Sequence, residues 1–296
     1  FTVMIIMKQS VKIRTRFAPS PSGDLHLGHG YSAKLNYDFA CAHNGDFILR
    51  IEDIDHLRCK RQFEQSIFDD LKWLGLKWPT PIRRQSEHFD DYQKALDKLQ
   101  NMTLLYPCFC SRKDILDEIN ESTRAPHMRP KLGPEGIIYP GTCRHLSPQE
   151  RAQKIAKNIP HALRLDMEKA LKTVGKDLYW TDLKSGEQLA DPTLLGDVVL
   201  ARKDFPTSYH LSVVVDDHIQ EISHVIRGQD LYYASHLHRL LQHLLDLNTV
   251  IYDHHPLLVT PDGNRLAKRD KSITLKSIKQ SGVDAKAIDA LIKQYL

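Results

Sequence analysis

The alternation of strand-like and helical patterns in the first hundred residues is the feature that most constrains the fold. Residues 12–18 have the pattern of a short strand, which ends in a Pro/Ser/Gly turn at residues 19–23. Apolar residues then recur at helical spacing up to Ala42, and residues 47–51 are again typical of a strand. Two more helical patterns precede Tyr106. This order favours a parallel sheet with helices on both faces, so we expect a Rossmann-like, doubly wound α/β domain.

The pattern changes in the second half of the chain. From Cys108 to about Pro160 the sequence is rich in Pro, Gly, Arg and His, which predicts an insertion with little core of its own. Leucines at helical spacing predict a helix around residues 237–245, and two short helices are expected in residues 274–296 on either side of Gly282. Strand patterns return in four segments: residues 162–165, 196–201, 219–226 and 255–260.

Composition excludes several classes of protein. The 296 residues are 41% hydrophobic and 26% charged, which is ordinary for a globular protein. Five cysteines are too few and too sparse for a disulfide framework. No apolar run approaches the roughly 18 residues that span a bilayer. We therefore expect a cytoplasmic protein with no membrane partner; its net charge of +4 permits a nucleic-acid partner without requiring one.

The motif His26-Leu27-Gly28-His29 lies where the first strand turns into the first helix. A helix start offers unpaired N–H groups and the positive end of the helix dipole, which suits a phosphate. Gly28 would let the backbone approach a nucleotide closely. His26 and His29 could then donate hydrogen bonds to phosphate oxygens. The alternative is a turn with two exposed histidines.

Five separated segments resemble, in order, the motifs of the glutamyl-type class I aminoacyl-tRNA synthetases. The H-x-G-H above is the family's HIGH motif, and the last segment occupies the place of the KMSKS loop. The resemblance extends from about Lys12 to Ile273 and implies the family's catalytic fold. The matching segments are residues 14–29, 50–55, 202–217, 224–230 and 264–269.

The resemblance implies an ATP site and a glutamate pocket. Arg16 and Arg227 would grip the side-chain carboxylate, because a guanidinium binds carboxylates bidentately. Glu52 would pair with the substrate's ammonium group, and Tyr209 would donate a hydrogen bond. By themselves, these residues could equally be solvated surface groups or a half-buried tyrosine. The implied glutamate pocket consists of Arg16, Phe17, Ala18, Pro19, Ser20, Glu52, Tyr209 and Arg227.

The implied ATP-binding residues are His26, Gly28, His29 and Lys268, of which the two histidines and the lysine would be catalytic. Lys268 would stabilise the charge of the departing pyrophosphate. The loop departs from the family pattern, because Arg265 replaces the first lysine and Ala267 replaces the usual serine. We expect the missing hydroxyl to slow activation without abolishing it.

Cysteines in the insertion predict a metal site. The pair Cys108 and Cys110 is followed by Cys143, and three thiolates leave one zinc ligand open. In short members of the family, the glutamyl-queuosine tRNA(Asp) synthetases, a tyrosine in a similar C-x-C…Y-x-x-x-C arrangement supplies the fourth ligand. The resemblance therefore implies Tyr139, with His127 and His145 as alternatives. A closed site of four ligands would be structural.

The resemblance implies a two-step ligase reaction. L-glutamate and magnesium-bound ATP would give glutamyl-adenylate, and an RNA hydroxyl would then accept the glutamate. The sequence stops about thirty residues after the KMSKS-like loop. We therefore expect no large anticodon-binding region, and transfer to queuosine in tRNA(Asp). A truncated fragment of a glutamyl-tRNA synthetase and an inactive RNA-binding paralogue, the latter motivated by Ala267, remain as alternatives.

These motifs also predict a division of the chain. The two halves of the catalytic domain would be residues 12–106 and 191–255. Residues 107–190 would form the inserted zinc-binding, acceptor-type subdomain. Residues 256–296 would hold the KMSKS-like loop and a small helical segment that contacts an RNA stem.

Overall fold

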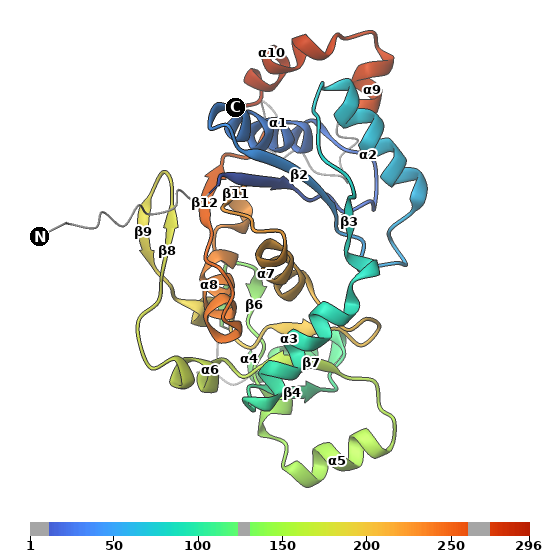
Figure 1. The fold of residues 1–296 in the computed structure, drawn as a ribbon. Helices are drawn as coiled ribbons and strands as arrows, with labels where there is room; N and C mark the ends of the chain where they lie inside the picture. The colour runs from blue at the N-terminus through green and yellow to red at the C-terminus, as the bar shows by residue number, and fades with distance from the viewer. Residues whose placement is uncertain (1–11, 124–130, 260–272) are drawn as a thin grey trace, which may run out of the picture.

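The computed structural model describes residues 12–123, 131–259 and 273–296, arranged around a twisted parallel sheet (Figure 1). The first half of this sheet has the order β3-β2-β1, and all its pairings are parallel. The predicted alternation of strands and helices and the Rossmann-like class are confirmed. The elements are β1 (Arg14–Phe17), α1 (Leu27–Ala42), β2 (Asp46–Ile51), α2 (Arg61–Trp73), β3 (Arg83–Arg84) and α3 (Phe89–Asn101).

The second half of the sheet has the order β11-β12-β8-β9, in which only the edge strand β9 is antiparallel. β11 lies beside β1, and the Ser223 N–H donates to the Arg14 carbonyl at 3.0 Å. The two halves thus meet, with the carboxyl ends of β1, β2 and β11 at one edge. The elements are β8 (Tyr179–Asp182), β9 (Gly186–Leu189), α7 (Tyr209–Ile219), β11 (His224–Gly228), α8 (Ala234–Leu245) and β12 (Ile251–His255).

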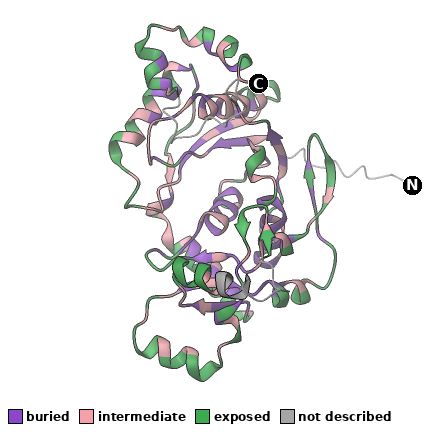
Figure 2. Ribbon diagram, turned by 180° about the vertical axis from the view of Figure 1, so that it is seen from behind, coloured by how far each residue is buried: buried purple, intermediate pink, exposed green. Residues whose placement is uncertain are grey.

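Two apolar cores hold the helices against opposite faces of the sheet. On one face, α1 and α2 pack with the C-terminal helices around residues such as Leu27, Leu49 and Ile67. On the other face, α3, α7 and α8 pack together through residues such as Leu99 and Leu240. Figure 2 shows buried residues concentrated along the sheet and these helices, with exposed residues on the outlying elements.

The region of the predicted insertion contains a separate antiparallel sheet of order β10-β7-β4, to which β10, from beyond the predicted boundary at residue 190, contributes a strand. Its own core is small: Tyr106, Cys108, Tyr139 and Cys143 form one buried cluster. Helix α5 buries none of its residues and projects from the body (Figures 1 and 2). The elements here are β4 (Leu105–Cys108), α4 (Arg112–Thr123), β5 (Leu132–Gly133), β6 (Gly136–Ile137), α5 (Pro148–Ala156), β7 (Ala162–Leu165), α6 (Met167–Val174) and β10 (Val199–Ala201).

The two predicted C-terminal helices are present as α9 (Leu275–Gln280) and α10 (Ile288–Lys293). The backbone just before α9 pairs with the backbone at the start of α1. The Leu27 N–H donates to the Ile273 carbonyl at 3.1 Å, and the Leu275 N–H donates to the Leu25 carbonyl at 2.8 Å. Residues 273–275, which follow the KMSKS-like segment in the sequence, therefore lie directly beside the H-x-G-H turn.

Two strand predictions were wrong in position. The predicted strand at residues 255–260 lies earlier, because β12 ends at His255. The last three residues of β12, Asp253, His254 and His255, are polar, although their side chains are buried or paired. The end of the strand therefore has no apolar pattern that could be recognised in the sequence. The predicted strand at residues 219–226 begins only at His224, because Ile219 ends α7. Helix α7 was not predicted; it contains three consecutive valines, which favour strands, but it is buried on most of its surface.

No helix in the described ranges is both long enough and apolar enough to cross a bilayer. The division of the chain into four segments stays a prediction.

Candidate active site and metal cluster

A cavity of about 270 Å³ lies at the edge where β1, β2 and β11 end. Lys268 lies outside the described residues, as do Arg265 and Ala267. All the other residues predicted to bind ATP or glutamate line this cavity: Arg16, Phe17, Ala18, Pro19, Ser20, His26, Gly28, His29, Glu52, Tyr209 and Arg227. The structure thus brings together side chains from four distant segments, and their individual roles stay predictions.

The first turn of α1 forms one wall of the cavity. The rings of His26 and His29 stack with centroids 3.7 Å apart, and the His26 backbone N–H donates to His29 Nδ1 at 3.2 Å. A Cβ atom at Gly28 would lie 3.0 Å from the His26 ring. Any larger residue would press on the stacked histidine, so glycine here leaves room for the ring as well as for any approach of the backbone to a nucleotide.

Arg227, at the end of β11, is a buried cation held by neutral groups. It is 5% exposed. Its guanidinium donates to His254 Nε2 at 3.2 Å, to the Tyr209 hydroxyl at 3.4 Å, to Ser235 Oγ at 2.7 Å and to the Leu231 carbonyl at 3.0 Å. Among the described residues, it forms no ion pair with a carboxylate. A buried charge of this kind favours a ligand that brings a carboxylate.

His254 is kept neutral so that it can accept from Arg227. Burial, followed by the nearby Arg227 charge, lowers the pKa of His254 to about 4. The Asp182 carboxylate accepts from His254 Nδ1 at 2.7 Å and from the His254 backbone N–H at 3.2 Å. The ring proton is thereby fixed on Nδ1, which leaves Nε2 as the acceptor facing Arg227. Asp182 and His254 are thus positioning residues for the guanidinium.

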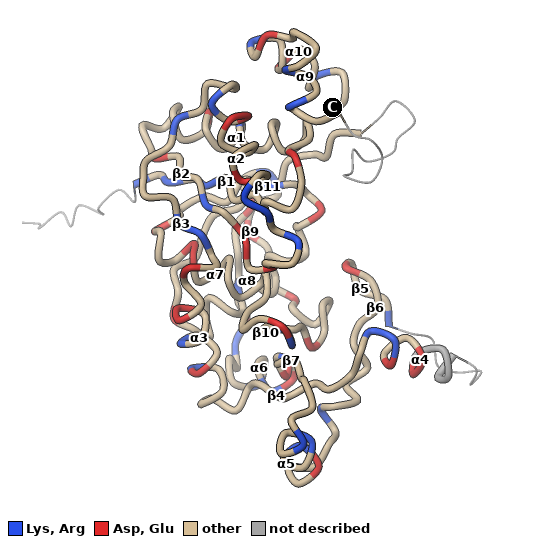
Figure 3. Tube along the Cα trace, turned by 90° about the vertical axis from the view of Figure 1, so that its right-hand side faces the viewer, with Lys and Arg blue, Asp and Glu red and all other residues tan. Residues whose placement is uncertain are grey.

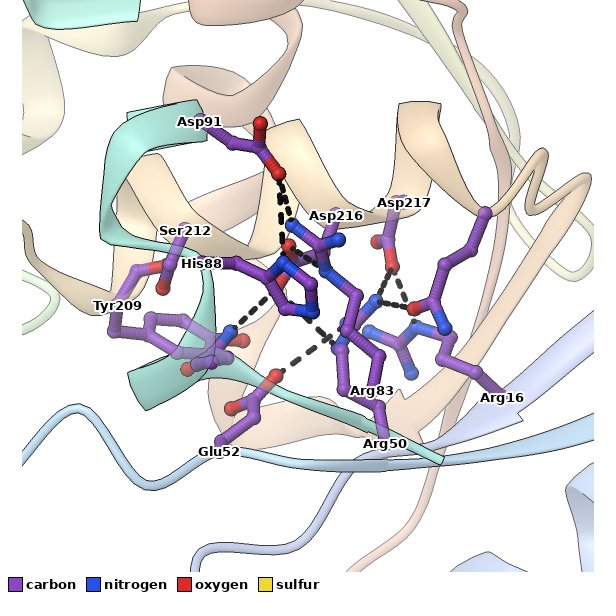
Figure 4. Close-up of polar contacts among 12 residues, drawn as sticks. Arg16, Arg50, Glu52, Arg83, His88, Asp91, Tyr209, Ser212, Asp216 and Asp217 are labelled. Carbon is purple, nitrogen blue, oxygen red and sulfur yellow. Dashed lines mark hydrogen bonds and ion pairs between the residues drawn. The ribbon is translucent and has the colours of Figure 1, made fainter. Parts of the chain in front are cut away.

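Arg16, in contrast to Arg227, already has an anionic partner (Figure 4). Its Nε lies 3.2 Å from Asp217 Oδ1. The same oxygen accepts from Arg50 at 2.8 Å, and Arg50 also contacts Glu52 Oε1 at 3.3 Å. Arg50 is completely buried. Asp217 of α7 therefore connects arginines of β1 and β2.

Asp216, the neighbour of Asp217, anchors a second set of partners and is itself fully buried. It accepts from Arg83 Nε at 2.7 Å, from Gln85 Nε2 at 2.8 Å and from the Tyr92 hydroxyl at 3.0 Å. Arg83 and Gln85 belong to the segment around β3, and Tyr92 belongs to α3. These contacts hold α7 against the first half of the sheet.

Glu52 sits between this network and the cavity. Its side chain is 13% exposed. Burial raises the pKa of Glu52 to about 7, against the opposing attraction of Arg50 and Arg16. A substrate ammonium group would favour the ionised form, so the charge of this carboxylate is coupled to occupancy of the cavity.

The four residues predicted to hold a metal form one cluster in the insertion. The three thiol sulfurs lie within 4.8 Å of one another, and Cys110 Sγ is 3.4 Å from Cys143 Sγ. The Tyr139 hydroxyl lies 3.4 Å from Cys108 Sγ and 3.6 Å from Cys110 Sγ. Ligands of a tetrahedral ion with metal–sulfur distances of about 2.3 Å would be about 3.8 Å apart. The donor set therefore fits one metal ion.

The histidine alternatives are less well placed. His145 is exposed and does not belong to the cluster. His127 lies outside the described residues. The remaining cysteines, Cys41 and Cys59, are exposed and partly buried, respectively, and neither belongs to the cluster.

Residues 12–293 match the family described as “tRNA synthetases class I (E and Q), catalytic domain”. The chain belongs to this family. This synthetase is 43% identical to the “Glutamyl-Q tRNA(Asp) synthetase” of Rhodobacter capsulatus, over 94% of its own chain and 99% of that protein. It is 34% identical to the “Glutamate--tRNA ligase” of Aquifex aeolicus, over 94% of its own chain and 56% of the ligase.

A solved structure supports the same assignment. The synthetase resembles a glutamate tRNA ligase from Elizabethkingia meningosepticum, solved in complex with its amino acid, with a TM-score of 0.76 and 26% identity. The similarity covers 95% of this chain and 60% of that one. As a member of the family, the synthetase is a ligase.

Sequence reasoning missed the residues that support the cavity of this synthetase. Arg50, Asp216 and Asp217 lie inside the matched motifs, and the two acids follow three consecutive valines directly. Acidic residues at the end of an apolar run are a signal of buried ion pairing that could have identified them. Asp182 and His254 lie in segments that matched no motif, so no pattern connected them to Arg227.

The cluster predicts one tightly bound metal ion per chain. Cys143→Ser should lose most of the metal, because it removes a thiolate from the closed site, whereas Cys41→Ser should retain it as the matched control. Elemental analysis of the purified, dialysed protein measures both. A metal-free wild-type protein would refute the site, and full retention in Tyr139→Phe would refute only the tyrosine as a ligand.

Proposed function

We propose that this synthetase activates L-glutamate with ATP and transfers the glutamate to queuosine in tRNA(Asp). The observation that carries the proposal is the buried Arg227 guanidinium, which faces the cavity without an anionic partner among the described residues. Glutamate offers a side-chain carboxylate for Arg227 and an ammonium group for Glu52. Its α-carboxylate would then be directed toward the first turn of α1.

Activation joins the glutamate α-carboxylate to the α-phosphorus of ATP. A carboxylate oxygen attacks phosphorus, the bond to the bridging oxygen breaks, and pyrophosphate leaves with the electron pair. His26, His29 and the N-terminus of α1 bind phosphate oxygens. We assign Lys268 to the departing pyrophosphate, and magnesium bound to ATP neutralises phosphate charge. Positioning and electrostatics provide the catalysis.

Transfer joins the glutamyl group to a hydroxyl of the nucleoside. The hydroxyl oxygen attacks the carbonyl carbon of glutamyl-adenylate and forms an ester bond. The bond between the carbonyl carbon and the phosphate oxygen breaks, and AMP leaves with the electron pair and takes up the hydroxyl proton. The higher identity to the Rhodobacter protein than to the Aquifex ligase supports queuosine of tRNA(Asp) as the acceptor. A tRNA acceptor also implies a cytoplasmic reaction.

The proposed metal is zinc. Three thiolates and a phenolate oxygen suit zinc better than calcium or magnesium, which prefer oxygen ligands alone. The cluster leaves no position open if Tyr139 binds, so the zinc would be structural. Its contribution would be to organise an insertion whose own core consists of the ligands and a few neighbouring side chains.

Glutamate should support exchange of pyrophosphate into ATP, and glutamine should hardly do so. An amide would leave the buried Arg227 without its anion, at a cost of roughly 2 kcal/mol or more, or about thirtyfold. Arg227→Ala should reduce glutamate-dependent exchange far more than it reduces ATP affinity. Arg58→Ala, at an exposed arginine, is the control. Comparable exchange with glutamine in the wild-type protein would contradict the proposal.

Glutamate binding should improve as the pH rises through about 7. The pKa of Glu52 is raised above its ordinary value, so the carboxyl is protonated below that pH and cannot pair with the ammonium group. The KM for glutamate in the exchange reaction should therefore fall between pH 6 and pH 8. Glu52→Gln should have a high KM without this dependence; if it kept the wild-type pH profile, Glu52 would not be the titrating group.

The acceptor assignment is tested with modified and unmodified tRNA. The synthetase should transfer radioactive glutamate to tRNA(Asp) that contains queuosine, and not to the same tRNA lacking it, because the acceptor hydroxyl belongs to the modification. Activation should proceed without tRNA. Efficient charging of the 3′ end of tRNA(Glu) would overturn the acceptor assignment while leaving glutamate activation intact. Absence of glutamate-dependent exchange would support an inactive paralogue instead.

A further inference from the structure

A second cavity, of about 310 Å³, lies between the hairpin β5–β6, strand β10 and the start of α7. Tyr209 lines both this cavity and the glutamate cavity. A group bound in the second cavity would therefore lie next to the glutamate cavity, with the Tyr209 side chain between them. Figure 3 shows the hairpin standing away from the body of the protein together with α4.

Several polar residues of the second cavity already have partners. Asp197 accepts from the Tyr106 hydroxyl at 2.6 Å and from the Met167 N–H at 3.0 Å. Arg164 donates to the Asp197 carbonyl at 2.7 Å, and its guanidinium lies 3.8 Å from the centre of the Tyr139 ring. These contacts are part of the framework, so these side chains are poor candidates for ligand binding.

Ser208 is the clearest sign that the cavity receives a polar ligand. It is 4% exposed and lines the cavity, immediately before α7. Its hydroxyl oxygen has no hydrogen-bond partner within the part of the chain that the structure describes. A buried hydroxyl without a partner costs free energy, which a hydrogen bond from a bound molecule would recover.

Glu135, in the β5–β6 turn, provides a negative charge at the same cavity. Its carboxylate lies 3.7 Å from His210 Nε2. A hydrogen bond from His210 lowers the pKa of Glu135, so the carboxylate is ionised at neutral pH. Apolar side chains complete the lining and offer a surface for a flat ring: Ile115, Ile137, Ile138, Leu194, Leu195, Val198 and Val199.

We propose that this second cavity binds the modified base of the acceptor nucleoside, with the Glu135 carboxylate paired to its ammonium group. The inference rests on the proposed function. The side chain of queuosine joins a secondary amine, protonated at neutral pH, to a ring that carries two hydroxyls. An ionised carboxylate, an unpartnered hydroxyl and an apolar wall match these three features. Binding there brings a ring hydroxyl toward the glutamyl carbonyl on the other side of Tyr209.

The charge of Glu135 distinguishes this ligand from an unmodified nucleoside. The terminal adenosine of a tRNA carries no cation, so its binding would not depend on an anion at this position. A base that carries an ammonium group should bind less well when Glu135 becomes neutral and much less well when it becomes positive. The series Glu135→Gln and Glu135→Lys therefore reports on the chemical class of the ligand.

The experiment compares transfer to queuosine-containing tRNA(Asp) with glutamate-dependent exchange in the same variants. Glu135→Gln should lower kcat/KM for transfer at least tenfold more than it lowers exchange, and Glu135→Lys at least a hundredfold more. Glu187→Gln and Glu187→Lys, at an exposed position on β9, are the matched controls and should change neither rate more than twofold. Parallel losses of transfer and exchange, or wild-type transfer by Glu135→Lys, would overturn the assignment.

Free nucleosides provide a second measurement on the wild-type protein. Queuosine should inhibit transfer to the tRNA competitively, and guanosine, which lacks the ammonium group, should inhibit at least tenfold more weakly. Equal inhibition would overturn the assignment. If wild-type protein transferred no glutamate to queuosine-containing tRNA(Asp), the proposed function itself would fail. If the wild-type protein transferred glutamate normally and substitution of Glu135 did not change the rate of transfer, only the assignment of the second cavity would fail, and the proposed function would stand.

Discussion

The rest of the catalytic domain depends on one buried carboxylate, that of Asp217, which bridges Arg16 of β1 and Arg50 of β2. Arg50 is fully buried, and a buried guanidinium is tolerated only with closely placed anions. Asp217 belongs to α7, which follows the insertion in the sequence. The ion pairs therefore connect the two halves of the domain across 201 and 167 positions of the sequence. Removing the carboxylate would break the ion pair of Arg16 and leave Arg50 with Glu52 and Asp216 as its anionic neighbours.

The network also explains which arginine remains available to a ligand. Asp216 and Asp217 provide anions for Arg83, Arg50 and Arg16, whereas Arg227 receives only neutral acceptors among the described residues. If His254 were protonated, it would be a second cation next to Arg227 and could not accept the hydrogen bond from the guanidinium. The low pKa that burial gives His254 prevents this. Within the part of the chain that the structure describes, Arg227 is thus a cavity guanidinium without a neutralising carboxylate, and the proposed selectivity for an acidic amino acid rests on it.

Sequence reasoning predicted the parts of this structure that depend on local pattern. The strand–turn–helix at His26, the helical spacing in α2 and α8, and the cysteine spacing are all local, and the structure brings those residues together as expected. Sequence reasoning failed where burial in the folded protein overrides the local secondary-structure preference of the residues. Helix α7 contains valines that favour strands, and β12 ends in polar residues, among them His254, whose partner Asp182 lies 72 positions earlier. No local pattern contains that pairing, nor does one indicate the second cavity, whose lining comes from five separate segments, around residues 115, 133–139, 164, 194–202 and 208–210.

The position of Tyr139 connects the metal cluster to the second cavity. Its hydroxyl contacts the cysteine sulfurs, while its ring lies under Arg164, which is fixed to the Asp197 carbonyl. Tyr139, Arg164 and Asp197 all line the second cavity, and none of them lines the glutamate cavity. The residues predicted to bind glutamate and ATP that line the first cavity lie on or next to β1, β2, α1, α7 and β11. If the acceptor binds in the second cavity as proposed, a structural metal would act on that binding through the cavity's own lining, and Tyr209 is a residue that the two cavities share.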